Sequence, residues 1–173
     1  MSGSAKQPRR PVALPIHYTP PHMMGVVMDL TSSYPRSAKD TIAGVAMIAR
    51  TTDKAKAKAR GNIGDYHYNC PMDANVFSFL GIDHEKFLQV VADAKDDGEI
   101  EAFVNGYASK KKPAEIAAWN AGFLQAVPAP GSDSEKYFLD LRSQLAPDRT
   151  DIRAWPDLLD LDEKRAVPRK TAV

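Results

Sequence analysis

The stretch SAKDTIAGVAMIARTTDKAKAKAR, residues 37–60, decides the fold class, because its apolar residues recur at helical spacing. It opens with Ser37-Ala38-Lys39-Asp40, which has the S-x-x-D form of a helix start. Gly61 comes directly after its last residue, and glycine commonly follows a helix C-terminus. We therefore predict one long helix over residues 37–60.

The apolar stripe of this predicted helix leads to a charged residue. At about 100° per residue, the stripe continues to Asp53. A buried carboxylate needs a partner, because leaving it unpaired is costly, and Arg50 stands three residues earlier. Two interpretations stay open: an ordinary ion pair on a solvated basic helix, or Arg50 and Lys54 bordering a pocket for an anionic ligand. The stripe itself consists of Ile42, Val45, Ala46 and Ala49.

Downstream of this helix, capping residues and prolines mark further helices. Another helix is indicated by apolar residues between 137 and 145, and a short one by residues 155–159. The extended pattern of residues 63–68 allows one short strand-like segment. Together these patterns predict an all-α, mainly helical fold of about six helices in a single compact domain. The predicted helix starts are Asp73, Asp83, the Asp96-Asp97-Gly98 turn and Pro113, and the predicted aromatic core residues are Phe87, Phe103, Trp119, Phe123 and Phe138.

Composition and proline placement set the domain organisation. The chain has 173 residues, 43% of them hydrophobic, which suits one globular domain. Residues 1–28 hold five prolines and three basic groups but no acid, so they are expected to form a flexible N-terminal arm. The helical domain is expected over residues 29–165 and a C-terminal tail over residues 166–173. No long apolar run and no leader-like segment is present, so we expect a cytoplasmic protein without a membrane partner.

The loop GDYHYNCPMD, residues 64–73, gathers the most reactive side chains of the chain. Its Tyr66, His67, Cys70 and Asp73, together with Asp53 on the predicted helix, are the candidate catalytic residues. Arg50, Lys54 and Tyr68 are the candidate ligand-binding residues, since guanidinium and ammonium groups suit carboxylate or phosphate. Cys70 is either a nucleophile near a helix start or a small buried hydrophobe.

No metal or cofactor is expected at these residues. A single cysteine excludes an intramolecular disulfide and a Cys-only zinc site. The spacing of His67, Cys70 and Asp73 lacks a second ligand pair, and the chain has no glycine-rich phosphate loop. These patterns argue against P-loop, dinucleotide-binding and zinc proteins.

Four short sequence segments occur in the same order and at the same intervals as in a known protein family. They are DLTSSYPRS from Asp29, ARTTDKAKA from Ala49, GNIGDYHYNCPMD from Gly61 and FLGID from Phe79. The sequence resembles the bacterial family called domain of unknown function 5069, most distinctly over residues 29–107 and more loosely to about residue 165. The resemblance implies a small, mainly helical domain and transfers no reaction. The arm before Asp29 lies outside it.

Three functions from different classes are compatible with these observations. The leading hypothesis is an enzyme or ligand-binding domain for a small anionic metabolite, with a cofactor-free lyase, isomerase or cyclase as the reaction class. The alternative is a non-catalytic interaction or regulatory module, which predicts a homodimer or heterocomplex with the loop tyrosines and the tryptophans as anchors. Nucleic-acid binding is the third, and the slightly acidic balance of residues 29–173 argues against it. The residues leave open whether the domain is an enzyme.

Overall fold

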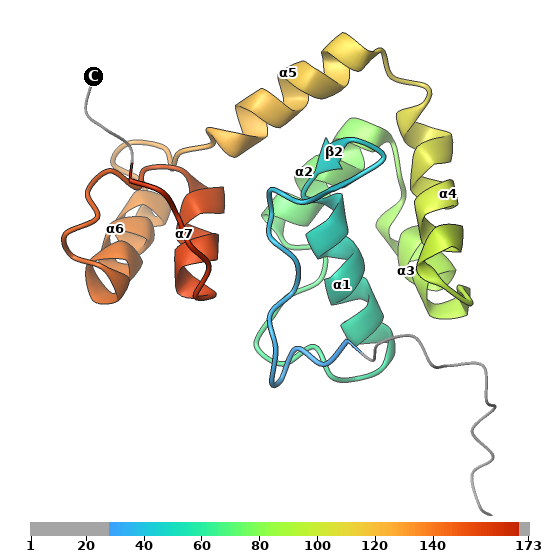
Figure 1. Ribbon diagram of the computed structural model, residues 1–173, viewed down its shortest axis with the longest axis horizontal. Helices are drawn as coiled ribbons and strands as arrows, with labels where there is room; N and C mark the ends of the chain where they lie inside the picture. The colour runs from blue at the N-terminus through green and yellow to red at the C-terminus, as the bar shows by residue number, and fades with distance from the viewer. Residues whose placement is uncertain (1–27, 170–173) are drawn as a thin grey trace, which may run out of the picture.

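The computed structural model describes residues 28–169, which form seven helices and one short hairpin (Figure 1). The protein is therefore mainly helical, as predicted. The predicted arm, apart from Met28, and residues 170–173 of the predicted tail lie outside the described residues. In chain order the elements are β1 (Thr41–Ile42), β2 (Val45–Ala46), α1 (Ile48–Ala59), α2 (Pro71–Leu80), α3 (His84–Asp93), α4 (Asp97–Ala108), α5 (Pro113–Leu124), α6 (Asp133–Leu145) and α7 (Trp155–Asp162).

The long helix predicted over residues 37–60 is wrong in its first half, where the chain forms the β1–β2 hairpin. Thr41 pairs with Ala46 and Ile42 with Val45 in an antiparallel register. The turn residues Ala43 and Gly44 have φ values of 51° and 75°, which is the positive-φ pair of a tight two-residue hairpin. Glycine reaches this conformation without strain and weakens a helix interior, so the hairpin prevails and α1 begins only at Ile48.

The segment over residues 63–68, where the sequence allowed a short strand, contains no strand and instead has turns at residues 64–65 and 68–69. The backbone N–H of Leu30 donates to the carbonyl of Asn62 at 3.0 Å, which holds this loop against the first described residues. Gly64 has φ +60° and lies so close to Leu30 that an added Cβ would come within 2.7 Å of the Leu30 carbonyl oxygen. The positive φ of Gly64 and its close contact with Leu30 fit a turn and not an extended strand.

We expect Gly64→Ala to lower the free energy of unfolding by about 1–3 kcal/mol, because both the positive φ and the contact with Leu30 oppose a Cβ. Urea denaturation followed by circular dichroism measures the loss. Gly61→Ala is the matched control, since Gly61 has φ +74° but open space around its missing Cβ. Equal losses for the two variants would show that the contact with Leu30 contributes nothing.

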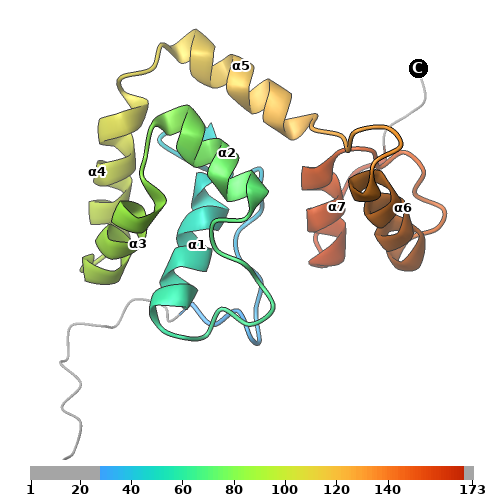
Figure 2. The ribbon, with the colours of Figure 1, turned by 180° about the vertical axis from the view of Figure 1, so that it is seen from behind.

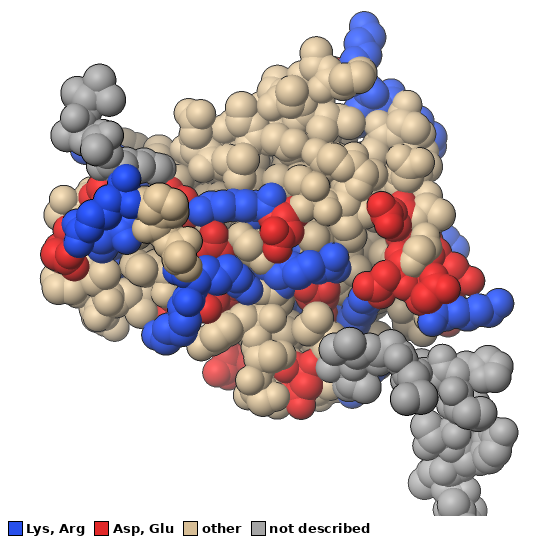
Figure 3. Space-filling view, in the orientation of Figure 1, with Lys and Arg blue, Asp and Glu red and all other residues tan. Residues whose placement is uncertain are grey.

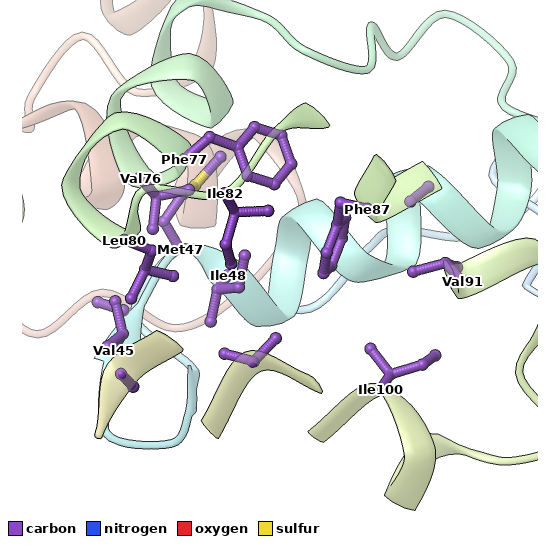
Figure 4. Packing of buried hydrophobic residues seen from close by; sticks show 14 of the residues in the cluster. Val45, Met47, Ile48, Val76, Phe77, Leu80, Ile82, Phe87, Val91 and Ile100 are labelled. Atoms are coloured by element: carbon purple, nitrogen blue, oxygen red, sulfur yellow. The ribbon is translucent and has the colours of Figure 1, made fainter. Parts of the chain in front are cut away.

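The main hydrophobic core surrounds α1. Figure 4 shows Val76, Phe77 and Leu80 of α2 gathered near Met47 and Ile48 at the start of α1. Of the five predicted core aromatics, Phe87 and Phe123 are buried in this cluster, while Phe103 and Trp119 pack against it half-buried. We call residues 28–124, which include this cluster, the main lobe.

A second, smaller core lies between α6 and α7. It contains Phe138, the fifth predicted aromatic, together with Ile152, Leu158 and Val167. The Trp155 ring meets the Phe138 ring edge-on, with centroids 4.9 Å apart. We call residues 133–167 the α6–α7 lobe. Figures 1 and 2 show α5 leading from α4 to this lobe, which then lies beside α1.

The helix starts predicted from capping residues are mostly confirmed. Asp83 and Asp96 cap α3 and α4 by accepting hydrogen bonds from backbone N–H groups, and Pro113 is the first residue of α5. The exceptions are Ser37, where no helix begins, and Asp73, which lies three residues beyond Cys70, the N-cap of α2. None of the helices within residues 28–169 is long and apolar enough to cross a membrane.

Candidate functional site

Helix α1 carries three buried charged residues, Arg50, Asp53 and Lys54, whose exposed fractions are 4%, 1% and 3%. They are buried because α1 lies at the centre of the main lobe, in contact with α2, α3 and the hairpin (Figure 1). Burial of a charge is tolerated only where a partner compensates its lost hydration. Each of the three finds its partner on a different segment of the chain.

Asp53 is paired with Arg36, not with Arg50 as the helical spacing suggested. The Arg36 side chain donates from Nη2 to Asp53 Oδ1 at 2.8 Å and from Nε to Oδ2 at 3.0 Å. The backbone N–H of Arg36 donates to Oδ2 at 2.8 Å. Arg36 stands before the hairpin, so Asp53 fixes that segment on α1, and the predicted intrahelical pair does not form.

Arg50 binds Glu163, which follows α7 at the far end of the chain. Its Nη1 and Nη2 donate to the two Glu163 carboxylate oxygens at 2.8 and 2.5 Å, a bidentate arrangement. Burial alone lowers the pKa of Arg50, but the hydrogen bonds and charge of Glu163 outweigh it and hold that pKa above its ordinary value. In Glu163, burial acts to raise the pKa, but the hydrogen bonds and charge of Arg50 together with the hydrogen bonds from Arg165 and Tyr66 outweigh it, so its pKa is lowered. Both groups are therefore charged at neutral pH.

Tyr66 and Arg165 complete the surroundings of the Glu163 carboxylate. The Tyr66 hydroxyl donates to Glu163 Oε1 at 2.9 Å, and the Arg50 guanidinium lies 5.5 Å from the centroid of the Tyr66 ring. Arg165 Nη1 donates to Glu163 Oε2. Burial, followed by the bond to Glu163, raises the pKa of Tyr66, so its phenol is a proton-bearing donor and not a base at neutral pH. We call Arg50 and Tyr66, the two donors that the main lobe supplies, the carboxylate site.

Lys54 forms a second group with Asp73, one turn of α1 further on. Its Nζ donates to Asp73 Oδ2 at 2.6 Å, to the His67 carbonyl at 3.1 Å and to Cys70 Sγ at 3.4 Å. The Asp73 carboxylate, completely buried, also accepts from Thr51 Oγ1 at 2.7 Å and from the backbone N–H of Cys70 at 3.2 Å. This group joins α1 to the start of α2 and leaves the Cys70 side chain half-buried beside the Lys54 ammonium.

The remaining two loop residues lie apart from both groups. The Tyr68 hydroxyl donates to the His84 carbonyl at 2.7 Å, and its ring meets the Phe77 ring edge-on at 6.0 Å. Burial is the main reason why the pKa of Tyr68 is raised. The His67 side chain is exposed, and only its carbonyl oxygen reaches Lys54. The eight predicted site residues therefore divide into two ionic groups with Asp53, Tyr68 and the His67 ring outside them.

Sequence reasoning missed Glu163, Arg165 and Arg36. The signal for Glu163 was indirect: a guanidinium and an ammonium on a core-facing helix require carboxylates, but no spacing says which ones. Glu163 is separated from Arg50 by 113 residues, so only the folded chain brings them together.

A cavity of about 140 Å³ lies elsewhere on the main lobe and is not lined by the predicted site residues. It is bordered by β1, by Thr52 of α1 and by the start of α4. Within residues 28–169, no three His, Cys, Asp or Glu side chains are grouped as metal ligands. The cavity is lined by Arg36, Thr41, Ile42, Thr52, Asp97, Ile100 and Glu101.

The fold and the site together define a mainly helical domain built around buried ionic groups on one central helix. The family model described as domain of unknown function (DUF5069) matches residues 32–165, and the chain belongs to this family. The match includes α1, the loop of residues 64–73 and Glu163, so every part of the carboxylate site lies within it. A comparison with curated proteins gave no match.

Proposed function

We propose that this protein binds a small molecule through a carboxylate or phosphate group, at the place that the Glu163 carboxylate occupies. One observation carries the proposal: donors from two distant segments of the main lobe converge on that single carboxylate, and a third donor stands two residues after it in the chain. They are the Arg50 guanidinium of α1, the Tyr66 hydroxyl of the loop and the Arg165 guanidinium after α7. A planar guanidinium that binds both oxygens is the usual means by which proteins recognise a carboxylate or a phosphate.

The position of Glu163 on its own helix supports a displaceable carboxylate. Glu163 is the C-cap residue of α7, and a negative charge at a helix C-terminus is disfavoured by the helix dipole. The next residue, Lys164, has a φ of 62°, which is uncommon for a residue other than glycine. Neither feature stabilises α7, so the carboxylate is held there by Arg50 and Tyr66 of the main lobe and by the neighbouring Arg165. A free ligand anion is not attached to the C-terminus of α7, so it binds without these two unfavourable features.

The other two functions have less support in the side-chain contacts. The aromatic residues expected to anchor a partner protein are engaged within the chain: Tyr66 with Glu163, Trp119 with Phe79 and Phe123, and Trp155 with Phe138. The large hydrophobic residues that are exposed in the described part are Tyr34, Val127, Tyr137 and Leu139, none of them a predicted anchor. Two of the basic residues on the helix that would supply charge to a nucleic acid, Arg50 and Lys54, are instead buried and bound to carboxylates.

The geometry supports binding ahead of catalysis. Cys70 and Asp73 contact Lys54 and not the carboxylate site, while the His67 ring is exposed. Tyr66 is the predicted catalytic residue that touches the site, and it is placed there as a hydrogen-bond donor. The proposal therefore assigns recognition of an anionic group to Arg50 and Tyr66.

Removing the internal carboxylate tests the proposal. In Glu163→Ala, acetate and inorganic phosphate should each raise the Tm by several degrees, because an anion that enters the vacated site stabilises the folded state by mass action. The measurement is a thermal melt followed by circular dichroism, with sodium chloride at equal ionic strength as the reference. A larger gain with one of the two anions identifies the preferred group.

Glu163→Gln is the matched control, because its side chain fills the site without a charge. It should show no gain beyond that of sodium chloride, and Arg50→Met added to Glu163→Ala should abolish the gain. Calorimetric titration of phosphate into the wild-type chain gives a second measurement, where weaker binding is expected because Glu163 competes. Equal gains in Tm for Glu163→Ala and Glu163→Gln would contradict the proposal. So would the absence of phosphate binding to both the wild-type chain and Glu163→Ala.

A further inference from the structure

The α6–α7 lobe is held together by its own apolar core. Phe138 of α6 packs with Ile152 and with Leu158 of α7, and Trp155 covers Phe138. This cluster is separate from the one that surrounds α1. The lobe therefore has the internal contacts needed to move as a unit.

The contacts of this lobe with the main lobe are mostly polar. Lys39 Nζ lies 2.7 Å from Asp157 Oδ1 and 3.0 Å from Asp160 Oδ2, and Ser37 Oγ donates to Asp160 Oδ1 at 2.7 Å. Leu159 adds an apolar contact with the main core. Figure 3 shows Lys and Arg side chains alternating with Asp and Glu in a band across this face of the molecule. A polar contact of this kind is weakened by salt, whereas an apolar interface is not.

Helix α7 is fastened differently at its two ends. At its start, the backbone N–H of Trp155 donates to the carbonyl of Ala126 at 2.9 Å, close to the connection that leads from α5. At its other end, about 12 Å away for eight residues, Glu163 enters the carboxylate site. A rotation about the Trp155 end would withdraw Glu163 while the apolar core of the lobe stays intact.

We infer that the α6–α7 lobe is a lid that closes the carboxylate site by placing the Glu163 carboxylate in it, so that the protein inhibits its own ligand binding. The inference rests on the proposed function, and it adds how that site is regulated. An anionic ligand and Glu163 compete for Arg50 and Tyr66, so ligand binding opens the lid. By the same linkage, any change that weakens closure strengthens ligand binding.

Lys39→Ala tests the lid without touching the carboxylate site. The Lys39 side chain is 34% exposed and forms two ion pairs across the lobes, with Asp157 and Asp160, so its loss should favour opening by about two- to fivefold, as for partly exposed ion pairs. Hydrogen–deuterium exchange of the full chain should then be faster by this factor in residues 155–163 and unchanged in α1 to α3. Phosphate should bind more tightly by a comparable factor. In the wild-type chain, about 1 M sodium chloride should accelerate the same amides.

Lys56→Ala is the matched control, because Lys56 forms an ion pair with Asp97 inside the main lobe. It should leave both exchange in residues 155–163 and phosphate binding unchanged. Exchange in α7 that changes only together with α1 to α3 would overturn the lid, because the chain would then open as one unit. Phosphate binding that leaves exchange in residues 155–163 unchanged would overturn the lid and preserve the proposed function. A lid that opens in Lys39→Ala, with no phosphate binding to any variant, would support the lid and overturn the proposed function.

Discussion

Replacing Asp73 by alanine is expected to lower the free energy of unfolding by about 3–5 kcal/mol. The Asp73 carboxylate accepts hydrogen bonds from Lys54, from Thr51 and from the backbone of Cys70, and it is completely buried. Its removal leaves the Lys54 ammonium buried without its charge partner, which is the costly half of breaking such a pair. Urea denaturation measures the loss.

Two further variants separate this cause from others. Asp65→Ala removes an exposed carboxylate from the same loop and should change stability by less than about 0.5 kcal/mol. Lys54→Met combined with Asp73→Ala should recover part of the loss, because no unpaired charge is then buried. A loss below about 1 kcal/mol in Asp73→Ala would mean that Lys54 reaches water or another carboxylate, and that the group does not hold α1 to α2.

Replacing Arg50 by methionine is expected to cost a similar amount, about 3–5 kcal/mol at neutral pH, because Glu163 is then buried without its bidentate partner. The cost should depend on pH. The folded-state pKa of Glu163 lies below its ordinary value of 4.5: burial raises it, but the hydrogen bonds and charge of Arg50, with the hydrogen bonds from Arg165 and Tyr66, outweigh burial. The contribution of the pair is therefore complete above pH 4.5 and is lost as the pH falls through the lower folded-state value.

The difference in stability between wild type and Arg50→Met should accordingly shrink in acid. Denaturation curves of both proteins, recorded from neutral pH downward, measure it. Arg149→Met is a suitable control, because Arg149 forms its ion pair with Asp151 away from the carboxylate site. A difference that stays constant with pH would show that Arg50 stabilises the protein by packing and not through the Glu163 charge.

The local parts of the fold were predictable from the sequence, because helix ends depend on neighbouring residues. Asp83, Asp96 and Pro113 mark the starts of α3, α4 and α5, and a capping group acts within one turn. The hairpin was missed although Gly44 was visible, because the apolar spacing of residues 42–49 fits a helix as well as a turn followed by α1. There the backbone preference of glycine outweighed the side-chain pattern.

The candidate site was only partly predictable, for a different reason. Helical spacing correctly brought Asp53 toward the core, and the reactive loop does lie against α1 through Lys54 and Tyr66. The partners of the buried charges were not predictable, because Arg36, Asp73 and Glu163 come from three segments that meet only when the chain is folded. Spacing along one helix placed Asp53 toward the core but did not show that Arg50 and Lys54 are buried too, and the tertiary fold decides what neutralises each of them.

The central claim is that Arg50 and Tyr66 form a site for an external carboxylate or phosphate, which Glu163 fills in the closed protein. A crystal structure of Glu163→Ala grown in acetate tests it most directly. The account predicts one acetate with its two oxygens about 2.7–3.2 Å from the Arg50 guanidinium, one of them also bonded to the Tyr66 hydroxyl. An Arg50 side chain paired with another carboxylate of the chain, in a site closed to acetate, would contradict it.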